Sequence, residues 1–448
     1  MLDKEAFRSY DIRGTYPKQV NEGLAYGVGR ALVRHLKVKE IVVGKDARAS
    51  GNKLFRALAK GINEEGCDVV YIGMCTTPLL NFAVVTGNFK AGVMISASHN
   101  PGEYNGFKVI KEGALQMHTK ELQKIREIAD GLGEAPAGGG CGKGKITEGD
   151  FLKEYLRHVQ KFAKGTGKMR VVVDYGNGVA SLTAKPLFEK LGLEIVALYE
   201  EPLPNFPNHE PNPHDLKNMD ELRGSVVREK ADLGLFFDGD GDRVAVVDEK
   251  GEIVEADLLV GVLAKEELAE GKKGKVYYDL RFSRAVGDAI SEQGGQPVMM
   301  RVGNPFYKER LREEGGVLAG EFSGHIMFPE NFNMDDGLFA AVKTMAAMAK
   351  HGKKISELIA PLRKYYATEE INLKVGDAKE VMAAVEAAFP EGKPREIDGL
   401  YLKFEWGWIS VRISRTEPLV RVRLEADSAE KRKEIREKVL GIISKTGE

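Results

Sequence analysis

Short apolar runs alternate with helix-period segments along the first three quarters of the chain. Each of three stretches begins with a β-branched or aromatic run, continues through an Asp with small or polar residues into a helix-period segment, and ends on a glycine and a second apolar run. These stretches are residues 41–73, 171–199 and 276–303, so the unit recurs about every 100 to 130 residues. A repeated strand–helix–strand unit predicts three similar α/β domains with mainly parallel strand pairs.

The repeat pattern stops near residue 364, and the remaining chain has a different plan. Strand-like runs at 369–375, 399–414 and 418–426 are interleaved with helix-period segments at 377–389 and 428–444, which predicts a smaller α+β domain. The glycine-rich stretch 131–150 is typical of a linker. We therefore predict an α/β fold of three similar mixed domains plus a smaller C-terminal α+β domain, with limits at 1–148, 149–249, 250–364 and 365–448.

Composition narrows the class of protein. The 448 residues are 43% hydrophobic and 30% charged, and 66 Lys and Arg nearly balance 67 Asp and Glu, so no basic footprint predicts a nucleic-acid partner. Three cysteines with no close-spaced pair fit a reducing cytosol. The charged N-terminus has no secretory h-region, and the longest apolar runs are too short to cross a bilayer. We expect a cytoplasmic enzyme with no membrane partner, and the sequence leaves a homo-oligomer open.

The strongest chemical signal is a run of alternating carboxylates and glycines between two apolar strands, at residues 233–251. Asp238, Asp240 and Asp242 repel one another, so a positive charge must lie among them. A hard divalent cation suits such oxygen ligands, and we expect Mg²⁺. An EF-hand has the same loop length, but Arg243 stands where that loop needs glycine, and strands rather than helices flank it.

Other polar patches each allow two interpretations. Ser98 and His99, after an apolar run, are either a nucleophile with its neighbour or an ordinary strand-end turn. The segment 319–328 offers hydrogen-bonding groups for sugar hydroxyls or is a plain polar loop. The segment 411–418 is either a phosphate cradle of guanidinium and hydroxyl groups or a solvent-facing strand end.

Five motifs in order resemble the α-D-phosphohexomutase superfamily, which includes phosphomannomutase/phosphoglucomutase. They are FRSYDIRG at 7–14, SASHNPGEYNGFK at 96–108, DGDGDR at 238–243, GEFSGH at 320–325 and RISRTEP at 412–418. The resemblance runs through nearly the whole chain and implies four domains around one central cleft. It also implies an isomerase, an intramolecular phosphotransferase.

The resemblance assigns roles to individual residues. Ser98 would be the phosphorylated serine and, with Asp238, Asp240 and Asp242, would hold Mg²⁺. The transfer site would be lined by Tyr10, Arg13, His99, Lys108 and Arg243. Sugar hydroxyls would be bound by Glu321, Ser323 and His325, and the unreactive phosphate by Arg412, Ser414, Arg415 and Thr416.

The implied reaction interconverts hexose 1-phosphate and hexose 6-phosphate through phosphoserine and a bound sugar 1,6-bisphosphate. A cation absorbs the charge that spreads during the transfer, and either Lys108 or His325 would be the general acid/base. Phe322 favours mannose or glucose. The substrate-binding position Asn304 matches neither the His of hexose enzymes nor the Asp of glucosamine mutases, and Arg415 departs from the usual phosphate loop, so phosphoglucosamine mutase and phosphopentomutase stay open. A non-catalytic module that binds phosphosugar and metal is the alternative from another class.

Overall fold

The computed structural model describes residues 3–132, 144–413 and 419–446. It packs as two compact units. One unit holds the chain up to Glu255 together with Asn304–Gly315 and Ser323–Leu358, and the other holds Ala256–Gly303, Gly316–Phe322 and the chain from Ile359.

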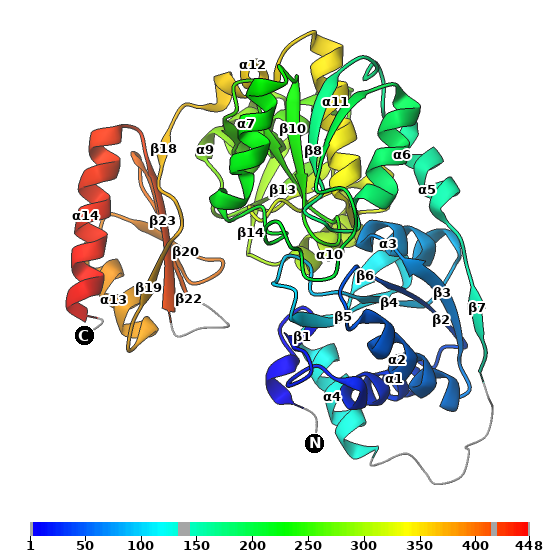
Figure 1. The fold of residues 1–448 in the computed structure, drawn as a ribbon. Helices are drawn as coiled ribbons and strands as arrows, with labels where there is room; N and C mark the ends of the chain where they lie inside the picture. Colours follow the sequence, from blue (N-terminus) through cyan, green and yellow to red (C-terminus); the bar gives the residue numbers. More distant parts are fainter. Residues whose placement is uncertain (1–2, 133–143, 414–418, 447–448) are drawn as a thin grey trace. The chain divides into compact units, whose positions relative to one another are not determined.

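The N-terminal sheet combines a parallel centre with an antiparallel edge (Figure 1). Its strands run in the order β1 (Ile12–Thr15), β5 (Tyr104–Lys111), β4 (Ala91–Ile95), β2 (Glu40–Lys45), β3 (Asp68–Met74) and β7 (Ile146–Glu148), with β6 (Leu115–Gln116) beside β5. The helices are α1 (Glu22–Leu36), α2 (Gly51–Glu64), α3 (Thr77–Thr86) and α4 (Lys120–Gly131). Because β4 and β5 are antiparallel neighbours, the loop that joins them lies at one end of the sheet.

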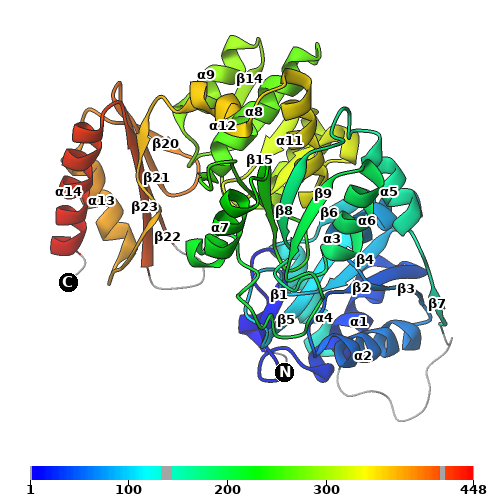
Figure 2. The same ribbon diagram turned by 45° about the horizontal axis from the view of Figure 1, so that its top comes forward.

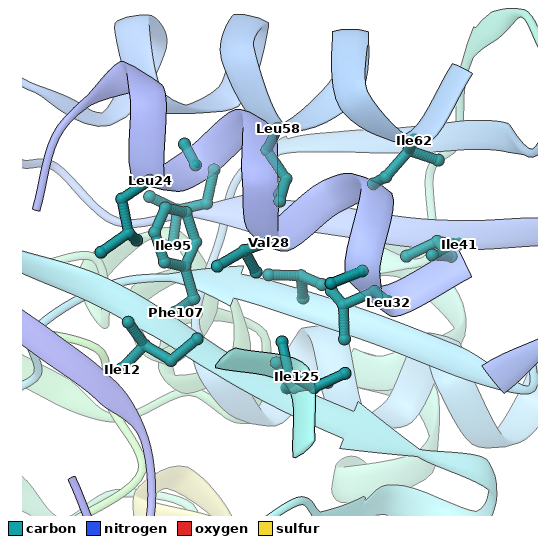
Figure 3. Close-up of a cluster of buried hydrophobic side chains, with 14 of the residues drawn as sticks. Ile12, Leu24, Val28, Leu32, Ile41, Leu58, Ile62, Ile95, Phe107 and Ile125 are labelled. Carbon is teal, nitrogen blue, oxygen red and sulfur yellow. The ribbon is translucent and has the colours of Figure 1, made fainter. Parts of the chain in front are cut away.

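The core of this domain shows why its sequence pattern folds as it does (Figure 3). Leu24, Val28 and Leu32 recur every fourth residue on α1, so they form one apolar stripe. This stripe packs with Ile95 of β4 and Phe107 of β5, all of them at most 2% exposed. Burial of this stripe fixes the position of β4, which leads into the Ser98 loop, and of β5, which carries Lys108.

The second sheet has the order β12 (Ile253–Val254), β11 (Val244–Val247), β10 (Leu233–Phe237), β8 (Arg170–Asp174) and β9 (Glu194–Leu198). Its parallel strands are β10, β8 and β9, while β11 returns antiparallel to β10. The accompanying helices are α5 (Leu152–Gln160), α6 (Ser181–Leu191) and α7 (Asp220–Arg228). The turn between β10 and β11 therefore lies at the carboxyl ends of the parallel strands.

The third region contributes to both units. In one unit, β13 (Lys275–Asp279) pairs in parallel with β14 (Gln296–Met300) and β15 (Leu318–Gly320), beside helices α8 (Ala256–Ala269) and α9 (Arg284–Glu292). In the other unit, β16 (Ile326–Phe328) and β17 (Met334–Asp335) form an antiparallel pair, with helices α10 (Asn304–Glu314) and α11 (Gly337–His351). The short helix α12 spans Ile355–Ile359.

The C-terminal sheet is antiparallel and has both of its helices on one face (Figures 1 and 2). Its strands are β18 (Tyr366–Ala367), β19 (Ile371–Lys374), β20 (Lys393–Glu396), β21 (Leu400–Lys403), β22 (Gly407–Ile413) and β23 (Leu419–Ala426). Val381 and Val385 of α13 (Ala378–Ala388) share a core with Ile435 and Val439 of α14 (Ala429–Thr446). This is the α+β domain that the loss of the repeat predicts.

The predicted strand–helix–strand repeat is confirmed in all three places. Strand β2 pairs in parallel with β3, β8 with β9, and β13 with β14, and each pair is joined through one helix. One detail differs, because the described end of the expected linker contains β7, which extends the first sheet beside β3. The domain limits and the central cleft remain predictions. Among the described residues, no helix is both long and apolar enough to cross a membrane.

Candidate active site

Ser98 lies in the loop between β4 and β5 and is almost fully buried, at 3% exposure. Its backbone is left-handed, with φ of 50°. Its hydroxyl donates to Asp238 Oδ2 at 2.8 Å and accepts from Arg243 Nη2 at 2.8 Å. The Ser98 oxygen is therefore held between a carboxylate and a guanidinium.

The carboxylate loop brings its three Asp side chains to one point. The turn after β10 is closed by Gly241 N–H donating to the Asp238 carbonyl at 3.0 Å, and Gly241 has φ of 72°. One oxygen from each of Asp238, Asp240 and Asp242 lies within 4.8 Å of the others. Gly239 permits the approach of the serine loop, because a Cβ there would lie 2.6 Å from the Ser98 carbonyl oxygen.

Two cations lie among these carboxylates. Lys108 Nζ, on β5, is 2.6 Å from Asp240 and 2.5 Å from Asp242, and Arg243 Nε donates to Asp238 at 3.0 Å. Burial alone would raise the pKa of Asp242, but Lys108 and neighbouring cations hold that pKa at about 2. Burial, together with Asp242 and Asp240, raises the pKa of Asp238 to about 7 against the opposing effect of Arg243. The ion pairs with Lys108 confirm that these carboxylates gather positive charge.

The oxygen atoms of the cluster fit a hard divalent cation. Asp240 Oδ1 and Asp242 Oδ1 are buried and have no hydrogen-bond partner among the described residues. Within the described chain, Lys108 and Arg243 form ion pairs with the three carboxylates, and mutual repulsion of the carboxylates favours a further positive charge there. Strands β10 and β11 flank the loop, which rules out an EF-hand. These three carboxylates therefore form a group that could hold a metal ion.

His99 Nδ1 lies 3.3 Å from Ser98 Oγ, but it is not a base reserved for that hydroxyl. The same nitrogen accepts a shorter hydrogen bond from Arg243 Nη2, and the Ser98 hydroxyl has the closer acceptor Asp238. Burial, and then Arg243 and Arg13, hold the pKa of His99 well below its ordinary value, which keeps the ring neutral. Arg13, on β1, donates to Asn100 Oδ1 at 2.7 Å, one residue beyond His99.

Tyr10 and the predicted residues after residue 303 extend this site within the same unit. Tyr10 packs edge-on against Phe306 of α10. His325 Nε2 lies 3.6 Å from Asp242 Oδ1, and Ser323 Oγ lies 2.7 Å from His325 Nδ1. Several of the predicted residues in this unit therefore lie together: Ser98, Lys108, Asp238, Asp240, Asp242, Arg243 and His325.

Asp335 is a functional candidate that the motifs did not indicate. Its carboxylate pairs with Lys308 at 2.6 Å, accepts from Asn304 Nδ2 at 2.6 Å and lies 4.0 Å from His325 Nε2. Thr77 is another, because its hydroxyl donates to Asp240 Oδ2 at 2.5 Å from the start of α3. Asp335 and Thr77 contact side chains that are distant in the sequence, so no local sequence pattern indicates their roles.

The predicted sugar and phosphate residues of the second unit converge on a cluster of arginines. Glu321 is buried and accepts from Gly303 N at 2.8 Å. The next residue, Phe322, donates its N–H to Asp279 at 3.1 Å, and its ring lies beneath the Arg281 guanidinium at 5.1 Å. Arg281 in turn reaches Glu370 at 3.3 Å.

Glu370 joins this cluster to the predicted phosphate residue Arg412. Arg412 Nη2 donates to Glu370 at 2.7 Å, and Arg421 reaches the same carboxylate at 3.3 Å. Arg423, also buried, stacks on Phe322 at 3.8 Å, and its Nε and Nη1 have no hydrogen-bond partner within the described chain. Several guanidinium groups around one Glu suit an anionic ligand. The predicted residues Ser414, Arg415 and Thr416 lie outside the described residues.

A buried serine beside a three-carboxylate group and an arginine is suited to phosphoryl transfer, and comparison with known proteins identifies the class. The α-D-phosphohexomutase superfamily has this fold. Family models for phosphoglucomutase/phosphomannomutase match the chain in four consecutive parts: domain I at residues 4–135, domain II at 153–251, domain III at 255–365 and the C-terminal domain at 370–442. The chain belongs to the phosphoglucomutase/phosphomannomutase family.

Curated relatives match along nearly their full length. The chain is 36% identical over 436 residues to a phosphomannomutase/phosphoglucomutase of Pseudomonas syringae, covering 96% of this chain and 92% of the relative. It is 34% identical over 447 residues to a phosphomannomutase of Methanocaldococcus jannaschii, covering 99% and 98%. A solved family member from Burkholderia thailandensis superposes with a TM-score of 0.91 at 31% identity, covering 100% of this chain and 98% of the other.

Proposed function

We propose that this protein interconverts hexose 1-phosphate and hexose 6-phosphate, with mannose or glucose as the sugar, through phospho-Ser98. The observation that carries the proposal is the position of Ser98 Oγ, 2.8 Å from both the Asp238 carboxylate and the Arg243 guanidinium. The named activities of the relatives at 34–36% identity support the same reaction.

The chain's own residues account for the transfer in the following way. The bond between phosphorus and Ser98 Oγ breaks while a bond forms to a sugar hydroxyl, which gives a sugar 1,6-bisphosphate and a free serine. The hydroxyl proton moves to His325, and the released Ser98 oxygen takes up a proton, for which the charged Lys108 is the alternative acid; both side chains lie at the carboxylate cluster. Arg243 stays hydrogen-bonded to the serine oxygen as charge develops there. The bisphosphate then reorients, and its other phosphate returns to Ser98.

Asp238, Asp240 and Asp242, together with the phosphoserine, would hold Mg²⁺. The acceptor-only oxygens of Asp240 and Asp242 that lack hydrogen-bond partners fit that ion better than a soft metal. When bound, the ion neutralises the charge that spreads over the phosphoryl oxygens. Lys108 is charged in the resting site, since Asp240 and Asp242 raise its pKa against the effect of burial.

The arginine cluster around Glu370 is proposed to bind the phosphate that does not react. Arg281, Arg412 and Arg421 supply donors, and a doubly charged phosphate would compete with Glu370 for them. Glu321, Ser323 and His325 are proposed to bind sugar hydroxyls.

We place this activity in the cytoplasm, on small phosphosugars. Cys67 and Cys75 are free buried thiols, which fits a reducing compartment. The balanced charge, with a sequence pI of about 6.8, favours a small anionic substrate over nucleic acid.

Intact-mass measurement of the purified protein tests the proposal. Incubation with glucose 1,6-bisphosphate and Mg²⁺ is expected to add one phosphate to Ser98, and Ser98→Ala is expected to lower mutase turnover by more than about 10³-fold. Removal of Mg²⁺ with EDTA is expected to stop both the labelling and the turnover, and re-addition restores them.

Ser291→Ala, at an exposed serine of α9, is the labelling control, because it keeps Ser98 and its surroundings available for phosphate. Full turnover by Ser98→Ala, or binding of hexose phosphate with no interconversion by the wild type, would contradict the proposal and favour the non-catalytic module. Mannose, glucose, glucosamine and ribose phosphates tested side by side then identify the sugar.

A further inference from the structure

The backbone of Ser98 is held on both sides by side-chain hydrogen bonds. A non-glycine residue in the left-handed region costs about 1–2 kcal/mol, so it persists only where its surroundings hold it. Here the Ser98 N–H donates to Ser96 Oγ at 2.8 Å, and the Ser98 carbonyl accepts from Arg48 Nη2 at 2.8 Å. Both peptide groups of the candidate phosphate carrier are thus fixed.

Arg48 directs the end of its guanidinium at this one loop. Besides Ser98, Nη2 donates to the carbonyl of Asn100 at 2.6 Å, and Nη1 donates to the carbonyls of Pro101 at 2.5 Å and Tyr104 at 2.9 Å. Three of these carbonyls belong to the loop between β4 and β5, and the fourth, that of Tyr104, belongs to the first residue of β5. A planar fork can hold several acceptors in a fixed arrangement, which a flexible ammonium cannot do.

Asp46 links Arg48 to Ser96. Its Oδ2 accepts from Ser96 Oγ at 2.7 Å and from Arg48 Nε at 3.0 Å, and its Oδ1 accepts from the Arg48 N–H at 3.0 Å. The side chains of Asp46 and Arg48 are fully buried, and the Phe206 ring covers the guanidinium at 4.9 Å. One carboxylate therefore orients both groups that hold the Ser98 peptide.

We infer that Asp46, Ser96 and Arg48 are positioning residues that hold Ser98 in its left-handed conformation and aim its oxygen at Asp238 and Arg243. The inference rests on the proposed role of Ser98 as phosphate carrier. Without these hydrogen bonds, the serine backbone relaxes toward an ordinary conformation and its oxygen leaves the two groups. Misplacing a reacting group by about 1 Å can cost 10²-fold in rate.

Rapid-quench phosphorylation of Ser98 by glucose 1,6-bisphosphate, with Mg²⁺ and the full-length protein, tests the inference. Arg48→Lys keeps the charge beside Asp46 but loses the fork, and it is expected to slow labelling by about 100-fold. Ser96→Ala removes the acceptor of the Ser98 N–H and the donor to Asp46, and it is expected to slow labelling by about tenfold. In steady state, kcat falls correspondingly, while KM for glucose 1-phosphate stays within about twofold.

Arg30→Lys is the matched control, because Arg30 is a buried arginine of the same domain that pairs with Glu65 at 2.9 Å, outside the Ser98 loop. It is expected to lower the melting temperature as Arg48→Lys does, without changing the labelling rate. Labelling by Arg48→Lys and Ser96→Ala as fast as by Arg30→Lys overturns the inference, as does a raised KM with unchanged kcat.

The two failures remain distinguishable. Wild-type protein that never acquires phosphate on Ser98 refutes the proposed function and the positioning role with it. Wild-type labelling with unaffected variants refutes the positioning role alone. If Arg48→Lys does not fold, Ser96→Ala decides the matter by itself.

Discussion

The turn after β2 and the turn after β13 are built alike but place their arginines on different partners. In each, an Asp at the strand end accepts the backbone N–H two residues on, Arg48 to Asp46 at 3.0 Å and Arg281 to Asp279 at 2.9 Å. In each, the arginine Nε also returns to that Asp. The ends of the two guanidinium groups differ: Arg48 donates to backbone carbonyls, whereas Arg281 donates through Nη2 to Asp279 at 2.6 Å and through Nη1 to the carboxylate of Glu370.

The difference shows that the same turn positions an arginine at the end of β2 and of β13, and that tertiary structure decides which groups this arginine binds. Backbone carbonyls are fixed acceptors, so Arg48 is suited to holding a loop. Glu370 is shared by several guanidinium groups, so Arg281 is suited to an exchangeable anion. In the second repeat, Asp174 makes the same turn with Gly176 at 2.8 Å but pairs with His209, so all three repeats share the Asp turn and two of them share the arginine.

Arg412→Ala tests the Arg281 side of the comparison with the largest expected effect. Arg412 shares Glu370 with Arg281, and a charge-assisted contact contributes about 1.5–3 kcal/mol, so we expect KM for the sugar phosphate to rise about tenfold to a hundredfold. Glu370 keeps Arg281 and Arg421, which preserves the fold. Steady-state kinetics measures the change.

Lys403→Ala is the control for Arg412→Ala, since Lys403 is an exposed cation on the adjacent strand β21. It removes the same formal charge and is expected to leave KM unchanged. An unchanged KM in Arg412→Ala would remove that residue from the phosphate site.

The sequence predicted most of the domain plan and much of the site, because both depend on local patterns. Apolar periodicity located the three repeats, and the clustering of Asp238, Asp240 and Asp242 followed from their alternation with glycine. The Asp at each strand end was also visible as part of the repeat. Its partner was not, since the distance from Arg48 to the Ser98 carbonyl depends on how β2 and β4 pair.

The sequence also did not indicate the residues whose partners lie far away in the chain. Asp335 meets Lys308 and Asn304 only because β17 and α10 pack together, and Thr77 meets Asp240 across a separation of 163 residues. No spacing in the sequence encodes these contacts. Only the folded structure shows the burial of Asp335 and Thr77 and the charged groups beside them.

Arg281→Lys sharpens the comparison with Arg48→Lys at a smaller effect. Lysine keeps the charge facing Glu370 but loses the fork, so we expect KM for the sugar phosphate to rise about fivefold with kcat nearly unchanged. Arg48→Lys is expected to show the opposite split, with kcat lowered and KM retained. If both substitutions changed the same kinetic constant, the two turns would share one role.

The smallest expected effect concerns the ion pairs of Glu65 with Arg30 and Arg34, because Arg30→Lys is the control variant for Arg48→Lys. Burial raises the pKa of Glu65, but Arg34 and Arg30 outweigh it and hold that pKa below its ordinary value of 4.5. A carboxylate with a lowered folded-state pKa stabilises the protein above its ordinary pKa, and this contribution is lost as pH falls through the folded value. Because Arg34 is 48% exposed, the contribution is discounted for solvent to about 0.5–1 kcal/mol.

Glu65→Gln tests this baseline in urea unfolding at a series of pH values, followed by hydrogen exchange of peptides from α1 and α2. We expect the wild type to be more stable than Glu65→Gln by about 0.5–1 kcal/mol at pH 7, with the difference disappearing as pH falls below about 4. Mutase turnover at pH 7 should be equal in the two proteins. A stability difference that persists at low pH would show that Glu65 acts by packing rather than by charge. Arg30→Lys would then no longer serve as the matched control for Arg48→Lys.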